Sequence, residues 1–176
     1  MHMTLTSQDG SYRAAAEQFG GAIARLARGY EADPGLADDL VQDIHAALWR
    51  SFAYFEGQCS VRSWVYRIAH NTAVSHVQSR MRQGRGGLVA LEDIEPVASD
   101  VDPEATADAG QTSTRLMATI HRLAPADRQV MLLYLEDLTA AEIGEVTGLS
   151  AGAVATRIHR IKGLLARQFS TQEDNR

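Results

Sequence analysis

Two segments of the sequence concentrate basic side chains without an acidic neighbour, and they are its clearest chemical signal. Residues 57–83 contain four arginines and no acidic residue, and residues 150–169 contain three arginines and one lysine, again with no acidic residue. The net charge of −5 arises because residues 84–112 carry seven acidic residues against a single arginine. Local cationic surfaces attract phosphates whatever the average charge of the chain. We therefore expect nucleic-acid contacts on both sides of an acidic segment.

Other reactive residue types form no pattern that predicts catalysis or metal binding. Cys59 is the single cysteine, so no internal disulfide forms, and the six histidines are scattered without metal-ligand spacing. The sequence contains no Ser/His/Asp arrangement and no carboxylate pair. It therefore predicts no catalytic residue, no metal and no cofactor. Without an apolar run of about 18 residues or an apolar signal core, we expect a cytoplasmic protein that does not insert into a membrane.

Apolar residues recur at helical spacing along most of the chain, and no run alternates between apolar and polar residues. Three amphipathic helices are expected in the first half, at about residues 12–32, 36–52 and 61–81. The acidic stretch that follows includes two prolines and predicts a linker. Helical spacing resumes at Leu116 and continues past Pro125. The predicted fold class is all-α, with two small helical domains joined by a flexible acidic linker.

Residues 138–150 carry the signals of a helix-turn-helix. Thr139 and Glu142 have the spacing of a capping box, which begins a short helix. Gly148 can end that helix in the left-handed conformation, and Ser150 can cap the next helix. A short helix, a tight turn and a longer basic helix are typical of DNA-binding proteins. An ordinary helical hairpin with a solvated basic face is the alternative, and the pattern does not specify a base sequence.

Four motifs occur in a fixed order before the helix-turn-helix. They are Leu36–Ile44 (LADDLVQDI), Phe55-Glu56-Gly57, Ser63–Ala73 (SWVYRIAHNTA) and Leu123–Val130 (LAPADRQV). In this order and spacing, the chain resembles bacterial sigma factors of the extracytoplasmic-function class. The resemblance covers nearly the whole chain, and several independent matches are more specific than any one motif.

The resemblance implies a two-domain, all-helical protein that binds core RNA polymerase, directs it to promoter DNA and is not itself an enzyme. Residues 8–86 would bind the polymerase and recognise and melt the minus-10 element. Residues 87–112 would form the acidic linker, and residues 113–172 would recognise the minus-35 element through the helix-turn-helix. The implied polymerase-binding residues are Asp39, Leu40, Val41, Gln42 and Asp43. Steps of three and four residues place the polar members of this set on one helix face. A merely solvated acidic face is the alternative.

In the resembled family, a short loop holds a base flipped out of the minus-10 element. Stacking and contacts to the base edge offset the cost of extracting that base. Trp64 is also a candidate core residue, and Cys59 a candidate loop filler. The implied minus-10 contacts are Phe55, Glu56, Gly57, Gln58, Cys59, Ser60, Arg62, Trp64, Arg67 and Asn71.

The second DNA contact would come from the recognition helix of the helix-turn-helix. This chain has Gly152-Ala153-Val154-Ala155-Thr156-Arg157 where the family commonly has Gly-Thr-Val-Lys-Ser-Arg. Because a hydroxyl and a basic group are lost, we expect weak minus-35 binding or an unusual preferred sequence. The implied minus-35 contacts are Ser150, Ala153, Thr156, Arg157, His159 and Arg160.

Three matters stay open on the sequence alone. The acidic linker is either a tether or a segment that approaches the active-site region of the polymerase. An anti-sigma factor is an expected further partner. The rival function is a stand-alone helix-turn-helix regulator, with residues 125–168 as its DNA-binding unit and a first half that senses a ligand or partner.

Overall fold

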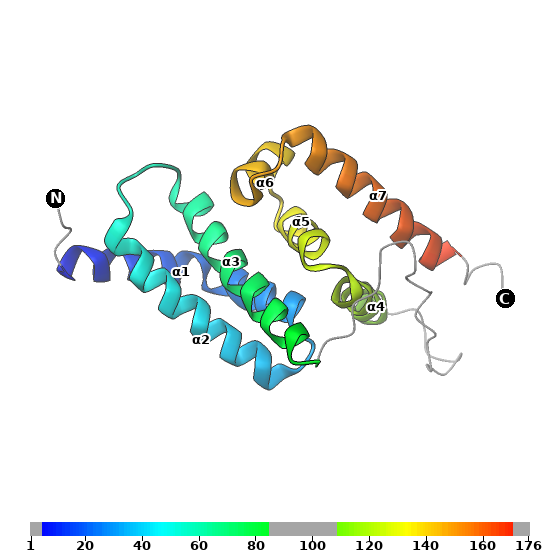
Figure 1. Ribbon diagram of the computed structural model, residues 1–176, viewed down its shortest axis with the longest axis horizontal. Helices are drawn as coiled ribbons and strands as arrows, with labels where there is room; N and C mark the ends of the chain where they lie inside the picture. The colour runs from blue at the N-terminus through cyan, green and yellow to red at the C-terminus, as the bar shows by residue number, and fades with distance from the viewer. Residues whose placement is uncertain (1–4, 85–108, 171–176) are drawn as a thin grey trace.

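The structure, a computed structural model, describes residues 5–84 and 109–170. These residues are almost entirely helical, so the predicted all-α fold class is confirmed (Figure 1). Within the two described ranges, no helix is both long and apolar enough to cross a membrane. The elements are α1 (Leu5–Tyr30), α2 (Pro34–Ser51), a short 3₁₀-helix (Phe52–Tyr54), α3 (Val61–Arg82), α4 (Ala109–Arg122), α5 (Pro125–Leu135), α6 (Ala140–Thr147) and α7 (Ala151–Ser170).

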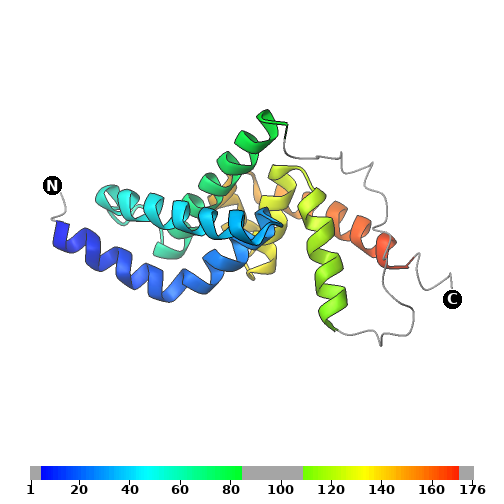
Figure 2. The same ribbon diagram turned by 90° about the horizontal axis from the view of Figure 1, so that it is seen from below.

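The first three helices pack side by side and carry the loop that precedes α3 (Figures 1 and 2). α2 begins where the Asp33 side chain accepts a hydrogen bond from the Leu36 amide, 2.9 Å away, and where Pro34 supplies the first helical turn. The apolar stripe expected in this helix is buried against its neighbours, as its spacing predicts. Its fully buried members are Leu40, Ile44 and Leu48.

A buried hydrogen bond joins the end of α1 to the middle of α3. The Tyr30 hydroxyl lies 2.8 Å from Nδ1 of His70, and both side chains are buried. Burial lowers the pKa of His70 to about 3, so its imidazole is neutral at ordinary pH. A neutral imidazole nitrogen accepts a hydrogen bond from the Tyr30 hydroxyl. This bond fixes the end of α1 against the helix that carries Arg62 and Arg67.

Two predicted boundaries differ from the structure. α1 begins at Leu5 rather than near Tyr12, because polar contacts that apolar spacing does not reveal hold its first turns. Gln8 donates to the Trp49 carbonyl oxygen at 2.7 Å, and the Trp49 indole donates to Asp9 at 2.8 Å. The predicted linker ends earlier than expected, because residues 109–112 already belong to α4. The rest of that linker, 87–108, lies outside the described residues.

The predicted helix-turn-helix is present in the second half of the chain. Thr139 and Glu142 make both hydrogen bonds of the capping box at the start of α6. Gly148 ends α6 with a φ of 80°, in the left-handed conformation that favours glycine. The Ser150 hydroxyl then accepts a hydrogen bond from the Ala153 amide at 3.1 Å and caps α7. Each local signal noted in residues 138–150 thus has its expected structural effect.

Gly144 allows α6 to approach the turn closely, and replacing it should destabilise the helix-turn-helix. A Cβ at this position would lie 2.6 Å from the Leu149 carbonyl oxygen, which is backbone and cannot easily move aside. We expect Gly144→Ala to lower the free energy of unfolding by about 1–3 kcal/mol. Gly152→Ala is the matched control, because no atom lies within 4 Å of its added Cβ. Because alanine is favoured over glycine in a helix, the free energy of unfolding of the control should rise by about 0.5–1 kcal/mol. Urea unfolding of both variants measures the difference, and equal stability would contradict the assigned contact.

The two halves of the chain pack directly against each other. Buried side chains from α1 to α3 and from α4 to α7 form one continuous apolar core. Leu132 of α5 lies against Gly29 of α1. A Cβ added at Gly29 would lie 2.4 Å from the Cδ2 atom of Leu132. Arg128, which is 4% exposed, donates to the Tyr30 carbonyl oxygen at 2.9 Å. The second half is therefore seated on the end of α1 and on α3.

Candidate nucleic-acid and protein interfaces

The predicted polymerase-binding residues of α2 divide between the surface and the core. Asp39, Gln42 and Asp43 are exposed, whereas Leu40 is fully buried and Val41 is half-buried. The helix thus turns a polar, acidic stripe outward while its apolar residues hold it on α1 and α3. The expected division of the helix into two faces is confirmed. The three polar residues are free to contact a partner that presents basic groups.

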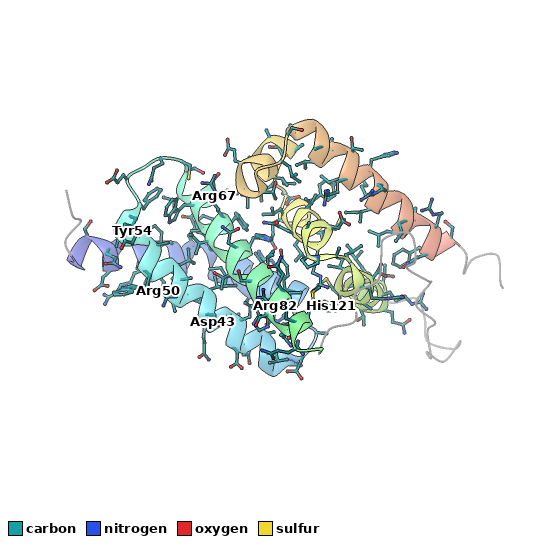
Figure 3. All side chains as sticks on the ribbon, in the orientation of Figure 1. Asp43, Arg50, Tyr54, Arg67, Arg82 and His121 are labelled. Atoms are coloured by element: carbon teal, nitrogen blue, oxygen red, sulfur yellow. The ribbon has the colours of Figure 1, made fainter. Side chains whose placement is uncertain are left out.

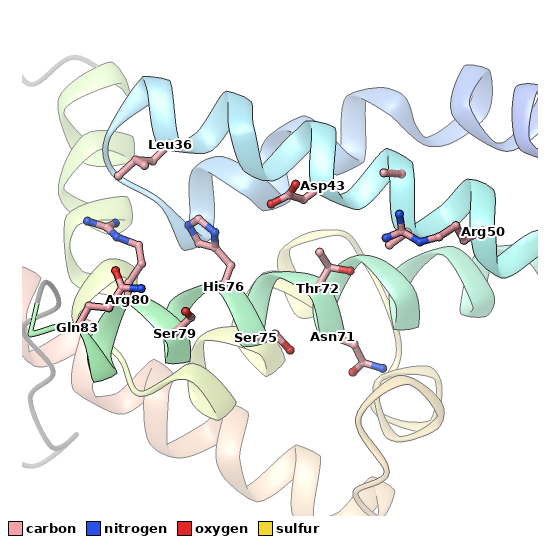
Figure 4. A pocket seen from close by; sticks show the side chains of 12 residues that line it. Leu36, Asp43, Arg50, Asn71, Thr72, Ser75, His76, Ser79, Arg80 and Gln83 are labelled. Carbon is pink, nitrogen blue, oxygen red and sulfur yellow. The ribbon is translucent and has the colours of Figure 1, made fainter.

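Asp43 also borders a groove of about 800 Å³ between α2 and α3 (Figure 4). Arg50 from α2 and Asn71 from α3 line the same groove. Asn71 follows Ser60 by eleven positions, which is about 16 Å along a helix at the usual rise. The structure therefore does not bring Asn71 together with the loop residues with which the sequence grouped it.

Aromatic side chains pack the base of the loop before α3. The ring of Phe55 lies 5.8 Å from the ring of Phe52 and 5.2 Å from that of Trp64, measured between centroids. The Trp64 indole donates to the Ser51 hydroxyl at 3.0 Å. Phe55 and Trp64 are both half-buried. They hold the loop on α2 and α3, so the core alternative for Trp64 agrees with its surroundings.

Polar residues of the loop shape it through local hydrogen bonds. The Gln58 side chain donates to the Tyr54 carbonyl oxygen at 2.9 Å and accepts from the Glu56 amide at 2.8 Å. Gly57, which lies between Glu56 and Gln58, has a φ of 79°. Ser60 caps α3 by accepting from the Ser63 amide at 3.0 Å. Cys59 is a half-buried free thiol within the same loop. The exposed Glu56, Gly57, Gln58 and Ser60 stay accessible while they maintain this shape.

Tyr54 is a candidate site residue that the sequence reasoning did not select. It is 73% exposed at the start of the loop, where Figure 3 labels its side chain. An exposed ring with a free face is suited to stacking on an unpaired base. The available signal was the pair of adjacent aromatics, Tyr54-Phe55, in a turn. Only the structure distinguishes the ring that packs inward from the ring that faces solvent.

Arg62 and Arg67 of α3 contact the second half of the chain. Arg62 donates to Glu142 at 3.4 Å and to the Glu136 carbonyl oxygen at 3.2 Å. Arg67 donates to the Glu145 carbonyl oxygen at 2.6 Å (Figure 3). Both guanidinium groups are thus engaged by oxygen acceptors of the segment from the end of α5 through α6. The sequence placed these arginines on a free cationic surface, and tertiary packing covers part of that surface.

The exposed face of α7 contains most of the predicted minus-35 residues. Ser150, Ala153, Thr156, His159 and Arg160 are exposed, in agreement with a helix face that approaches DNA. Arg157 differs, because its guanidinium donates to the Asp127 carboxylate at 2.9 Å and is half-buried. Asp127 is itself buried, and Arg160 lies farther from it, at 3.8 Å. Arg157 therefore joins α7 to α5, and Arg160 is the better placed of the two for phosphate.

Comparisons with known proteins agree with this arrangement. The Sigma-70 region 2 family matches residues 15–83, and the Sigma-70 region 4 family matches residues 113–165. The RNA polymerase sigma factor NccH of Alcaligenes xylosoxydans xylosoxydans is 31% identical over 85% of this chain and 81% of NccH. The ECF sigma factor SigW of Bacillus subtilis is 28% identical over 76% of this chain and 75% of SigW.

A solved structure has the same fold. The sigma factor RpoE of Bartonella quintana, in complex with the anti-sigma factor NepR, superimposes with a TM-score of 0.65. That match has 19% sequence identity and covers 90% of this chain and 96% of RpoE. The family matches and the curated relatives together establish identity at the level of the family: the chain belongs to the extracytoplasmic-function class of sigma-70 factors.

The protein is an alternative sigma factor, which binds core RNA polymerase and directs it to promoter DNA. The rival interpretation as a stand-alone helix-turn-helix regulator is wrong. Its first half would then be a sensing domain, whereas residues 15–83 match sigma region 2. The region 2 match runs from within α1 to the end of α3, and the region 4 match includes the helix-turn-helix.

Proposed function

We propose that three exposed surfaces of this sigma factor divide the work of initiation. The polar stripe of α2 binds core polymerase, the loop before α3 captures an unpaired minus-10 base, and the exposed face of α7 contacts the minus-35 duplex. The observation that supports this proposal is that the three surfaces are separate on one fold, with apolar residues buried beneath each of them. On this proposal the chain recruits and positions the polymerase and performs no catalysis itself, and it acts in the cytoplasm, where RNA polymerase works.

The polymerase-binding surface is supported by exposure without internal partners. Asp39, Gln42 and Asp43 face solvent, and no ion pair is seen for either aspartate within the described residues. Exposed carboxylates on a rigid helix give directional attraction to a basic partner surface. Leu40 and Val41 act indirectly, because their burial holds the helix in place. Charge reversal of Asp39 and Asp43 tests this surface through its effect on binding to core polymerase.

The minus-10 surface combines the exposed Tyr54 ring with the cationic start of α3. A flipped base needs a ring on which to stack, and its flanking phosphates need nearby positive charge. Tyr54 supplies the ring, and Arg62 and Arg67 supply the charge. Gln58 and Ser60 keep the loop in shape and remain accessible to a base edge. Replacement of Tyr54 tests this surface through its effect on promoter opening.

Arg160 and Arg157 should respond differently to replacement by alanine. Arg160→Ala should reduce the slope of log affinity against log salt by about 0.9 for the promoter duplex, since one phosphate contact is lost. Arg157→Ala should instead lower the free energy of unfolding by about 1–3 kcal/mol, because the buried Asp127 loses its hydrogen-bonded partner and keeps only the more distant Arg160. Fluorescence anisotropy over a salt series and urea unfolding separate the two effects. An unchanged salt slope for Arg160→Ala would remove Arg160 from the DNA contact.

An anti-sigma factor is the further partner that we propose. The structural neighbour RpoE is bound to the anti-sigma factor NepR, and its fold covers most of this chain. A protein that binds both halves of this sigma factor would compete with polymerase for the exposed stripe of α2. Copurification from cells, with and without purified core polymerase as competitor, tests this partner.

A further inference from the structure

Polar contacts hold the first turns of α1 against the end of α2, and the family match does not include these turns. The Sigma-70 region 2 match begins at residue 15, whereas α1 begins at Leu5. In both ribbon views the start of α1 lies beside the end of α2 (Figures 1 and 2). The brace, as we name it, consists of Gln8, Asp9 and Trp49. Trp49 lies five positions before Tyr54, at the start of the minus-10 loop.

Gln8 supplies the more shielded contact of the brace. Its side chain is buried and donates to the Trp49 carbonyl oxygen at 2.7 Å. Trp49 lies in the last turn of α2, where carbonyl groups lack a partner within the helix. Because Gln8 is buried, water cannot easily take the place of its amide group. Gln8 therefore fixes the position at which α2 ends and the 3₁₀-helix begins.

Asp9 holds the side chain of the same tryptophan. The Trp49 indole donates to the Asp9 carboxylate at 2.8 Å, so both the backbone and the side chain of Trp49 are bound to α1. One turn later in α1, a further contact involves Tyr12. Burial lowers the pKa of His45, and its neutral ring accepts a hydrogen bond from the Tyr12 hydroxyl at 3.1 Å. This contact anchors α2 one turn before Trp49, independently of the brace.

The segment between the end of α2 and Tyr54 is packed on all its other contacts. Phe52 is fully buried, and its ring lies 5.8 Å from that of Phe55. The Ser51 hydroxyl accepts from the Trp64 indole at 3.0 Å. α1 itself packs on the 3₁₀-helix that ends at Tyr54. A displacement of the last turn of α2 would therefore be passed on to the Tyr54 backbone.

We infer that the brace positions Tyr54 for the capture of an unpaired minus-10 base. Gln8 and Asp9 are then positioning residues, because they act through Trp49 and do not contact DNA. This inference rests on the proposed function, since it takes Tyr54 to be the ring on which the base stacks. Fixing the backbone that carries an exposed ring lowers the entropy lost when a ligand orders that ring. The first turns of α1 thus contribute to promoter opening.

Open-complex formation by the assembled holoenzyme tests the inference. The brace variant is Gln8→Met with Asp9→Ala, which keeps an unbranched side chain at position 8 and removes both contacts to Trp49. The matched control, Glu17→Ala with Gln18→Met, makes the same changes at exposed positions of α1. The promoter is one that the wild-type holoenzyme transcribes. Permanganate reactivity of its unpaired thymines measures open complexes, and titration with core enzyme measures recruitment.

We expect the brace variant to form open complexes roughly fivefold less well than the wild type and the control, the change that corresponds to one net hydrogen bond. Core binding should stay within about twofold, because Tyr12 and the buried residues of α2 still anchor the polymerase-binding stripe. Asp9→Asn keeps an acceptor for the indole and should behave as the wild type does. Asp9→Ala alone should show part of the defect, and it provides the same measurement if the double replacement does not fold.

A double-mutant cycle with Tyr54→Ala separates positioning from a general loss of stability. If the brace acts through Tyr54, adding the brace changes to Tyr54→Ala should cause no further loss of open complexes, because both act on one contact. A brace defect that adds in full to that of Tyr54→Ala would overturn the inference. Undiminished opening by the brace variant would also overturn it, as would an equal loss of core binding.

Failure of the proposed function would look different. In that case Tyr54→Ala by itself would form open complexes as the wild type does, whatever the brace variant does. If Tyr54→Ala impairs opening while the brace variant matches the control, base capture by Tyr54 stands and only the positioning by α1 is wrong.

Discussion

Replacing Asp39 and Asp43 together with arginine should abolish copurification of this sigma factor with core RNA polymerase. Both carboxylates are exposed on one face of α2. Reversing them sets like charges against a basic partner surface, which costs several kcal/mol in interfaces of this kind. We expect a loss of affinity of about a hundredfold or more. Titration of labelled sigma factor with purified core enzyme measures this loss directly.

The control for this experiment is Glu17→Arg, a reversal at an exposed position of α1. Leu40 and Ile44 remain in the core in the arginine variant, so its helical circular dichroism and unfolding transition should match those of the control. Folded but unbound protein would support the assignment. Wild-type affinity of the arginine variant for core enzyme would show that polymerase binds a different surface.

Tyr54→Ala should impair promoter opening while sparing recruitment of the polymerase. The side chain is 73% exposed, so its removal costs little packing. Stacking of one base on an aromatic ring is worth about 1–3 kcal/mol, which corresponds to a decrease of about 5- to 150-fold in open complexes. Tyr54→Phe keeps the ring and should retain most activity. Core binding and minus-35 binding should be unchanged, because α2 and α7 supply those contacts.

Two templates identify the step at which Tyr54 acts. One is fully paired, and the other has its minus-10 region melted beforehand by mismatches. Premelting removes the cost of unpairing but leaves the stacking partner missing. We therefore expect partial rescue of Tyr54→Ala on the melted template, measured by run-off transcription. Full activity of Tyr54→Ala on the paired promoter would refute the role of this ring.

Local signals in the sequence were sufficient for the elements of the fold. The capping box of Thr139 and Glu142 begins α6, and Gly148 ends it in the left-handed conformation. The apolar spacing of α2 correctly predicted the burial of Leu40, Ile44 and Leu48, whereas Val41 is only half-buried. These features depend on neighbours within a few positions, where hydrogen bonding and side-chain periodicity act. The order of the motifs along the chain is likewise sufficient to indicate the family.

Helical periodicity assigns a residue to a face but does not say what covers that face. Phe55 and Tyr54 are adjacent aromatics, yet Phe55 packs on Phe52 and Trp64 whereas Tyr54 is exposed. Arg157 was expected to face DNA, but it pairs with Asp127, thirty positions earlier in the chain. Such partners are chosen by how distant helices pack, which local spacing does not encode.

The sequence alone therefore determined the helices, the helix-turn-helix and the family of this sigma factor. Only the tertiary structure decided which of its arginines are covered by oxygen acceptors. Arg62 and Arg67 lie in a segment without acidic residues, which predicts a surface open to phosphates. Packing of the second half brings Glu142 and the end of α6 onto them across about eighty positions of the chain. An oxygen acceptor that is distant in sequence can satisfy an arginine as well as a phosphate can, because the guanidinium responds only to the local charge and geometry.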